Sequence, residues 1–475
     1  MALPTQKDDF PAWYQEVVKQ AGLAEPSLGT RGAFVIKPYG YAIWEAIRDA
    51  VDARIKSTGH ENLYFPMLIP NHLLELEKDH AEGFASEVAV VTHAGGQKLE
   101  GPLVVRPTSE TIIWATYAKW VQSYRDLPLL YNQWANVVRW ELRPRVFLRT
   151  TEFLWQEGHT AHETSEEAMA ETLRILHEVY ADAVESVLGV PVLRGRKSAS
   201  ERFPGAEETF TIEAMMRDGK ALQSGTSHYF GQKLATVYGV QFQSRAGELE
   251  HAYATSWGVS TRLVGGVIMT HGDDKGLRLP PGIAPHQVVI VPIFKSDEDR
   301  ARVYQRADEV RRALQGWRVK VDERDHLRPG FKYNEWELKG VPVRIDLGPR
   351  DVEADHLVIA RRDGKEKETV PTSSAPARVA EVLAEIQRAL FDDAARFRSE
   401  HTFQPKDYGE FKALLDEPGG FMEGLWCGEA TCEAEIKAET KATIRILPLE
   451  REPVSGPCLH CGSDAAERAT WGLSY

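Results

Sequence analysis

The segment from Val137 to His159 concentrates arginines, carboxylates and aromatic side chains around one turn. Its pattern predicts two β-strands joined by an arginine-rich hairpin. Arg139 and Glu141 stand two residues apart, so on a strand their side chains share one face. A planar guanidinium placed there can bind a phosphate through two parallel hydrogen bonds. The pattern therefore predicts a phosphate-binding hairpin, and a solvated hairpin with a charged tip is the alternative.

A second candidate cation, Arg262, follows Val259-Ser260-Thr261 and precedes the glycine-bearing run 263–269. This order predicts a strand that leads into a helix. A nucleoside triphosphate needs a cation remote from Arg139. Arg262 and the ring of Phe153 would also suit a base held between a guanidinium and an aromatic face. The alternatives are a surface or capping role for Arg262 and a core position for Phe153.

All four cysteines lie after residue 426 and form two close pairs. Four thiolates can close a tetrahedral zinc shell, which leaves no open position for a substrate, so we expect a structural zinc. His460 stands between two of these cysteines and is expected to be a bystander. Four unrelated buried thiols are the alternative. The expected metal ligands are Cys427, Cys432, Cys458 and Cys461.

The chain has 475 residues, 43% of them hydrophobic, and a formal net charge of −13. This length allows about two to four domains. The negative charge disfavours a general nucleic-acid coat protein, so any RNA contact must come from local basic patches such as Arg194–Lys197. No apolar run approaches the roughly 20 residues of a membrane span, and residues 1–10 lack the order of a secretory signal. We therefore expect a soluble cytoplasmic protein without membrane contact.

The first 280 residues alternate helical and strand-like patterns, which predicts an α+β domain on a mainly antiparallel sheet. After Leu279-Pro280-Pro281-Gly282 the patterns predict a compact α/β domain in βαβαβ order over residues 283–375. Residues 376–475 are expected to form a small C-terminal α/β zinc domain, which starts with a helix near Ala377. Its aromatic end, Thr470–Tyr475, is not expected to be a loose tail.

Several motifs resemble one family. The hairpin resembles motif 2 of class II aminoacyl-tRNA synthetases, and the Arg262 segment resembles their motif 3. Residues 59–68 follow a predicted helix and resemble motif 1, which builds the dimer interface in that class. Four further stretches are similar to the prolyl-tRNA synthetases of the archaeal and eukaryote-like type: Pro107–Glu110, Trp155–His159, Phe203–Gly205 and Gln223–Gln232. The resemblance covers nearly the whole chain. It implies ATP and L-proline as substrates, tRNA(Pro) as acceptor, and a homodimer.

The resemblance also implies residue roles, with Arg139 and Arg262 as the catalytic pair. Proline would be bound by Thr108, Glu110, Arg139, Trp155, Glu157, His159, Phe203 and His228. ATP, with Mg²⁺ bridging its phosphates, would be bound by Arg139, Glu141, Arg149, Thr151, Phe153, Gln223, Thr226, Ser260 and Arg262. The chemistry agrees, because free proline presents an ammonium, a carboxylate and an apolar ring, and each of these needs a different partner.

In the second domain, Pro329–Asp351 resembles the class II anticodon-binding domain. Splayed single-stranded bases are read by side-chain donors and acceptors, and Glu337, Arg344 and Arg350 are the candidates. A solvated charged face is the alternative for each of these residues.

Three other functions compete with proline activation. A threonyl specificity would favour a metal ligand set in the catalytic domain, where there is no cysteine. A paralogue that adenylates without charging tRNA should lack an anticodon module. A zinc-bearing RNA-binding protein would have no use for Arg139, Glu141 and Arg262 together. About 100 residues separate Gly158 from Val259, too few for the large inserted editing domain of many bacterial prolyl enzymes.

Overall fold

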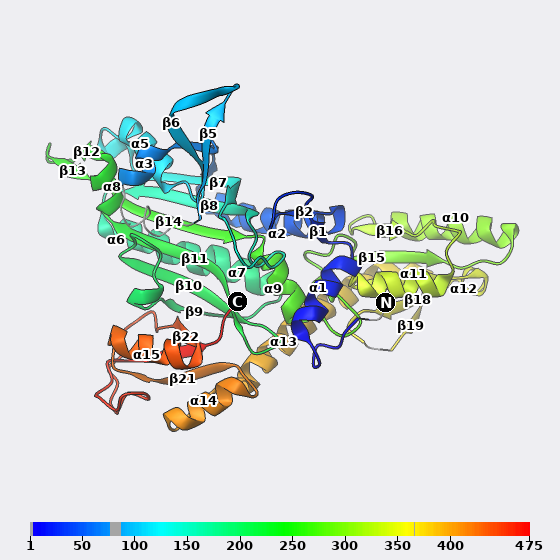
Figure 1. Cartoon of the computed structure of the whole chain (residues 1–475). Helices are drawn as coiled ribbons and strands as arrows, with labels where there is room; N and C mark the ends of the chain where they lie inside the picture. The colour runs from blue at the N-terminus through cyan, green and yellow to red at the C-terminus, as the bar shows by residue number, and fades with distance from the viewer. Residues whose placement is uncertain (1–2, 77–86, 365) are drawn as a thin grey trace.

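The computed structural model describes residues 3–76, 87–364 and 366–475. The chain folds into three units (Figure 1). A large domain carries the longest strands, a second domain lies beside it, and the C-terminal unit lies below strands β9 and β10 in this view.

The large domain is built on a seven-stranded sheet, in which every neighbouring pair is antiparallel except β3 with β7. In spatial order the strands are β3 (Glu61–Asn62), β7 (Leu129–Val138), β8 (Glu152–His162), β14 (Tyr253–Ser260), β11 (Ala221–Gly231), β10 (Glu208–Met215) and β9 (Val192–Arg196). The prediction of an α+β domain on a mainly antiparallel sheet is confirmed.

Helices bury one face of this sheet through apolar side chains at helical spacing. In α1 (Phe10–Gln20) the buried residues include Phe10, Trp13, Tyr14 and Val17, and the Asp9 side chain caps the first turn. Helix α9 (Arg262–His271) is buried from Leu263 onward. The other helices around the sheet are α2 (Pro38–Ser57), α5 (Glu110–Trp120), α6 (Ser165–Arg174), a π-helical stretch at Ile175–Ala181, α7 (Asp182–Ser186) and α8 (Lys233–Tyr238).

The large domain also contains smaller sheets outside its seven-stranded sheet. A three-stranded sheet has the order β4 (Leu68–Pro70), β6 (Gln97–Val105), β5 (Ala89–Ala94), and α3 (Asn71–Leu76) follows β4. Two-stranded ribbons are formed by β1 (Ala24–Pro26) with β2 (Phe34–Ile36), and by β12 (Gln241–Gln243) with β13 (Leu249–His251).

The second domain has a five-stranded sheet in the order β16 (Val319–Val321), β15 (Val288–Pro292), β17 (Val343–Leu347), β18 (His356–Arg361), β19 (Glu368–Pro371). Strand β15 is parallel to both of its neighbours, as expected for βαβ connections, and β18 and β19 are antiparallel. The helices are α10 (Asp297–Ala313), α11 (Pro329–Leu338) and α12 (Pro349–Glu353). The predicted βαβαβ order is confirmed.

Helix α13 (Ala375–Glu400) links the second and third domains. It starts close to the predicted Ala377, but its first half packs into the core of the second domain through Val379, Val382, Ile386 and Leu390. A division after residue 375 therefore separates this helix from the core that it covers. Sequence periodicity shows that a helix has an apolar face but not which sheet that face meets.

The C-terminal domain has a four-stranded sheet in the order β20 (Thr402–Phe403), β21 (Phe421–Trp426), β23 (Glu467–Gly472), β22 (Thr443–Ile446), with helices α14 (Tyr408–Asp416) and α15 (Ala430–Thr440). The end of the chain returns to the large domain, where Ser474 pairs with Ala221 at the start of β11. The hydroxyl of Tyr475 donates a 2.6 Å hydrogen bond to Asp218. The prediction that this terminus is not a loose tail is confirmed.

Candidate active site

Two adjoining cavities lie over strands β8, β14, β11 and β10 of the large sheet, with volumes of about 300 Å³ and about 140 Å³. Arg139, Phe153, Ser260 and Arg262 line both cavities. The two arginines that the sequence suggested as partners, 123 residues apart, therefore converge on one site.

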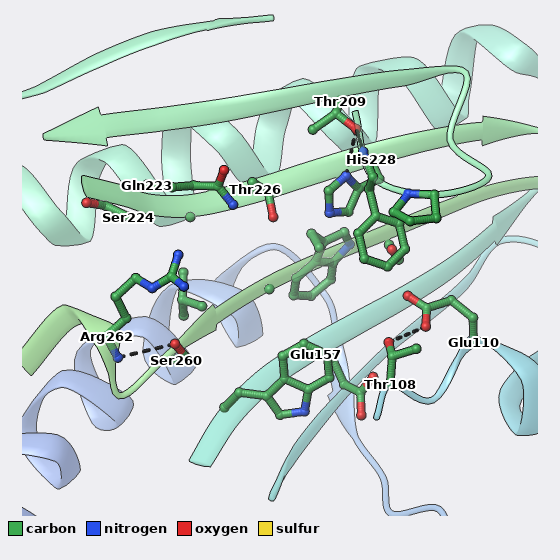
Figure 2. Close-up of a pocket in the computed structure, with 18 of the residues that line it drawn as sticks. Thr108, Glu110, Glu157, Thr209, Gln223, Ser224, Thr226, His228, Ser260 and Arg262 are labelled. Carbon is green, nitrogen blue, oxygen red and sulfur yellow. Dashed lines mark hydrogen bonds between the residues drawn. The ribbon is translucent and has the colours of Figure 1, made fainter. Parts of the chain in front are cut away.

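The eight residues predicted to bind proline all line the larger cavity. Figure 2 shows Thr108, Glu110, Glu157 and His228 toward one end and Arg262 with Gln223 toward the other. We call the first group, together with His159, the carboxylate end. The arginine end consists of Arg149 and Arg262 with the neighbouring Glu141, and Arg139 lies where the two cavities meet.

The residues predicted to bind ATP are divided between the cavities. Arg139, Phe153, Gln223, Thr226, Ser260 and Arg262 line the larger one, and Glu141 and Arg149 line the smaller one. Thr151 lines neither, because its hydroxyl donates 2.9 Å to the Arg31 carbonyl and its backbone N–H donates to Gly32. The neighbouring Thr150 lines the smaller cavity instead. Alternation along a strand end cannot tell which of two adjacent threonines faces the cavity once the strand has begun to turn.

The hairpin differs from its predicted form at its tip. Strand β7 ends at Val138, and beyond it the Arg139 N–H donates 2.9 Å to the Thr151 carbonyl. Glu141 lies in the turn, where its carboxylate accepts from the Arg143 N–H at 2.9 Å. The expectation that Arg139 and Glu141 lie on a strand is therefore wrong, although both side chains reach the smaller cavity.

Glu157 is the centre of a buried hydrogen-bond network at the carboxylate end. Its carboxylate accepts from the Ser109 hydroxyl at 2.6 Å, from Gln133 Nε2 at 2.8 Å and from His159 Nε2 at 3.0 Å. Burial opposes the charge on Glu157, but His159 and the other donors outweigh burial and lower the pKa of the carboxyl. Burial likewise opposes a charge on His159, but the bond to Glu157 and the nearby carboxylates raise its pKa.

Further polar side chains complete this end. Thr108 donates a short hydrogen bond to the Glu110 carboxylate, and both residues are buried. The His228 ring lies 4.6 Å from the ring of Phe203, and its Nδ1 is 3.0 Å from the Thr209 hydroxyl. These residues place carboxylates beside aromatic surfaces, which suits a small ligand with one ammonium and one apolar ring.

Arg139 is held between the two ends. Its Nε donates 2.9 Å to the Pro107 carbonyl, and its guanidinium lies 5.6 Å from the Phe153 ring centre and 5.3 Å from that of Trp155. Burial lowers the pKa of Arg139, and the carboxylates of Glu87 and Glu110 oppose that change. This cation is therefore positioned to meet an anion shared by the two cavities.

Arg262 is the first residue of α9, as the sequence predicted. Its backbone N–H donates 3.2 Å to the Ser260 hydroxyl and its Nε donates 3.2 Å to the Leu148 carbonyl. Burial and the nearby cations Arg149 and Arg139 lower the pKa of Arg262 to about 10. Three guanidinium groups thus lie close enough to repel one another, an arrangement that a polyanion would stabilise.

Several lining residues were not predicted from the sequence: Glu87, Thr150, Glu201, Arg202, Pro204, Thr209, Ser224, Ser256 and Gly258. One of them had a visible signal, since a glycine inside a strand indicates a close backbone approach. A Cβ on Gly258 would lie 3.1 Å from the Gln156 carbonyl oxygen. Apart from Pro204, the others are polar residues of ordinary types whose position only the fold reveals.

The four cysteines come together in the C-terminal domain, where their sulfur atoms all lie within 4.8 Å of one another. Cys432 and Cys458 are 3.7 Å apart. Zinc–sulfur bonds of about 2.3 Å in a tetrahedron require sulfurs about 3.8 Å apart, so the cluster fits zinc. His460 is not an uninvolved neighbour, because its Nδ1 lies 3.3 Å from the Cys432 sulfur.

The three residues predicted to contact an anticodon lie apart in the second domain. Arg350 is exposed at the start of α12. Arg344 pairs with Asp346 at 2.8 Å and covers the Tyr333 ring at 4.0 Å. Glu337 pairs with Lys275 of the large domain at 3.1 Å, beside the Arg362–Asp273 ion pair that joins the two domains.

Among the described residues, no helix is long and apolar enough to cross a membrane.

Three family models match the chain: a class II tRNA synthetase core domain (G, H, P, S and T) at residues 93–271, an anticodon-binding domain at 287–382, and a prolyl-tRNA synthetase C-terminal domain at 408–475.

Proteins of known name are similar over the full length. A proline--tRNA ligase of Roseiflexus castenholzii is 52% identical over 471 residues, which cover 98% of both chains, and one of Chloroflexus aurantiacus is 51% identical with the same coverage. Among solved structures, prolyl-tRNA synthetase from Cryptosporidium parvum, complexed with halofuginone and AMPPNP, has a TM-score of 0.94 at 39% identity and covers 99% of each chain.

Proposed function

The chain belongs to the prolyl-tRNA synthetases of class II. From that premise we propose that its two adjoining cavities bind L-proline and ATP side by side, so that the two react to give prolyl-adenylate and pyrophosphate. The protein is a proline--tRNA ligase. It activates proline to prolyl-adenylate and transfers the prolyl group to tRNA(Pro). The threonyl alternative fails, since the relatives compared are named for proline.

The carboxylate end binds proline in this proposal. Glu110 and Thr108 accept the secondary ammonium, and His228 completes the contacts to the amino acid. Trp155, Glu157, His159 and Phe203 surround the ring. The support is that all of these side chains line one cavity, in which Glu157 is fixed by three donors.

The arginine end binds ATP. Arg139 binds the proline carboxylate and the α-phosphate together, so a carboxylate oxygen attacks the α-phosphorus in line and pyrophosphate leaves. Arg262 and Arg149 neutralise the departing phosphates, and Phe153 offers an aromatic face to the base. No protein nucleophile takes part, because positioning and charge neutralisation supply the rate.

Mg²⁺ is expected with ATP. Glu87 and Glu141 line the smaller cavity and would supply carboxylate oxygens of the kind that Mg²⁺ takes as ligands. The ion would neutralise phosphate charge. Glu141 also stands 3.6 Å from Arg149, so the same carboxylate would orient a phosphate-binding cation.

One observation carries this function: Arg139 and Arg262 line both cavities, one of which also holds the carboxylate end. Amino-acid-dependent pyrophosphate exchange, measured with each of the twenty amino acids, tests it. Proline should give the dominant exchange rate. Absence of proline-dependent exchange in a folded protein that is supplied with Mg²⁺-ATP would refute the proposal.

tRNA(Pro) is bound by the second domain, with Arg350 and Arg344 as candidate contacts. Glu337 is the weaker candidate, because it faces Lys275 across the domain boundary. We also propose a homodimer formed through the motif 1 segment. Its support is a row of exposed apolar side chains, Tyr64 at 67%, Met67 at 38% and Leu68 at 38%, near Trp120 at 45%. Light scattering of the purified protein would test it.

The thiol cluster is proposed to hold one structural zinc through its four cysteines. We place the enzyme in the cytoplasm, where ATP and tRNA are available and where thiols of this kind stay reduced. Metal analysis of the purified protein should give one zinc per chain.

A further inference from the structure

The loop 198–204 forms one wall of the proline cavity through Glu201, Arg202, Phe203 and Pro204. Its far end is fixed within the large domain, since the Phe203 N–H donates 3.1 Å to the Thr209 hydroxyl that also contacts His228. The near end of the loop is held differently, by residues more than 230 positions later in the chain.

Two side chains of helix α15 in the C-terminal domain hold that near end. The Ser198 hydroxyl donates 2.6 Å to the Glu433 carboxylate, and both residues are buried, with 1% and 3% exposed. Lys437, one helical turn further on, donates 2.9 Å to the Glu201 carboxylate. The two contacts therefore come from one face of α15.

The docking of the C-terminal domain makes these contacts rigid. Arg196 and Leu447 exchange backbone hydrogen bonds of 2.8 and 2.9 Å, so β9 pairs with the C-terminal domain. A Cβ on Gly195 would lie 2.3 Å from the Leu447 carbonyl oxygen, so this approach needs glycine. Beside it, Glu213 is fully buried and paired with Lys197 at 2.6 Å and with Arg445 at 2.9 Å.

We propose that Glu433 and Lys437 are positioning residues for proline, through which the C-terminal domain shapes the amino-acid cavity. Cys432, near the start of α15, belongs to the thiol cluster, which fixes the position of the helix. The helix in turn fixes the loop 198–204 and, through it, the position of Phe203. The inference rests on the proposed proline cavity. It gives the C-terminal domain a part in amino-acid binding that acts through the loop 198–204 and is separate from any contact with RNA.

The test is pyrophosphate exchange with proline and ATP titrated separately. Glu433→Ala should raise the KM for proline about tenfold, the scale for a lost hydrogen bond to a charged group, and leave the KM for ATP unchanged. Lys437→Ala should give a smaller change of about threefold, because that pair is partly solvated. Lys412→Ala is the matched control, since it breaks an ion pair of 2.7 Å with Glu439 inside the same domain.

Two further measurements separate positioning from general damage. Ser198→Ala should raise the KM for proline like Glu433→Ala, and the double variant should add little, because both remove one contact. Amide exchange over residues 198–206 should be faster in these variants and unchanged in Lys412→Ala. If Glu433→Ala does not fold, Ser198→Ala and Lys437→Ala carry the test alone.

An unchanged KM for proline in Ser198→Ala and Lys437→Ala would overturn the inference, as would a rise in the KM of both substrates together. Either result leaves the proposed function standing if the parent protein shows proline-dependent exchange. Absence of that exchange in the parent would instead refute the proposed function.

Discussion

The carboxylate end and the arginine end of the active site are built in opposite ways. At the carboxylate end, Glu157 accepts three hydrogen bonds from protein side chains, and Glu110 accepts one from Thr108. At the arginine end, the Arg262 side chain donates to the Leu148 backbone carbonyl, and burial together with the cations Arg149 and Arg139 lowers its pKa. The carboxylate end has its counter-charges inside the protein, whereas at the arginine end Glu141 lies 3.6 Å from Arg149 and Arg262 gains its counter-charge from the substrate.

This difference teaches how a cavity can separate selection from reaction. A buried network in which three side chains bind one carboxylate is rigid and suits discrimination of a small amino acid by shape. Concentrated positive charge that Glu87 and Glu141 neutralise only in part binds a triphosphate strongly and stabilises charge that develops on it. Mutations at the two ends should therefore differ in kind.

The largest effect is expected at the junction. Arg139→Ala should lower kcat/KM for pyrophosphate exchange by about 10²- to 10³-fold, the cost of one preorganised donor at a reacting group. Both substrates should be affected, because this guanidinium lines both cavities. Arg143→Ala, at the exposed hairpin tip, is the control. Near-normal exchange in Arg139→Ala would contradict the role of the junction.

At the carboxylate end, Glu157→Gln should raise the KM for proline about tenfold with little change in that for ATP. It should also destabilise the fold by about 3 kcal/mol, because it leaves His159 without its buried partner. Separate substrate titrations and denaturant unfolding measure the two effects. A variant that affected only ATP would reverse the assignment of the two ends.

The pH dependence of stability should identify the same pair. Glu157 has a pKa below its ordinary 4.5, so its contribution is present above that pH and is lost as the pH falls through the folded value. His159 has a pKa above its ordinary 6.5, so its contribution is full below pH 6.5 and is lost as the pH rises through the folded value. The difference in unfolding free energy between parent and His159→Gln should therefore be largest between pH 4.5 and 6.5. A difference that is independent of pH would show that the pair is not ionised.

The smallest effect on folding stability is expected at the arginine end and has the opposite sign. Because the pKa of Arg262 is lowered to about 10, its charge disfavours the folded state at neutral pH in the absence of an anion. Arg262→Gln should therefore stabilise the ligand-free protein by about 1 kcal/mol while it removes the thermal stabilisation by ATP. Thermal unfolding with and without Mg²⁺-ATP measures both. A destabilised variant would show that Arg262 is a structural residue.

The sequence motifs predicted much of the site, since the residues expected to bind proline do share one cavity. The prediction worked because side chains two residues apart on a strand stay together and because Arg262 begins a helix at a fixed place. The prediction failed at the hairpin tip, because β7 ends before Glu141. Beyond the end of a strand, the direction of a side chain no longer follows from strand alternation.

Long-range docking was beyond sequence analysis. The pairing of Glu213 with Arg445 joins residues 232 positions apart, and nothing in either segment marks the other. Glu337 shows the same limit of sequence analysis. It lies on a helix of the anticodon-binding domain, but its carboxylate pairs with Lys275 of the large domain. The four cysteines were easier, since a metal site needs only ligand type and spacing to be seen.

The bridge between Arg196 and Leu447 has a consequence for chain truncation. Strand β9 is the last strand of the large sheet, and its outer edge is covered by the C-terminal domain. A chain shortened after residue 407 would leave this edge bare beside the buried charges of Lys197 and Glu213. An exposed edge strand can pair with a strand of another molecule. The shortened protein should therefore aggregate and should not form an independently folded catalytic fragment.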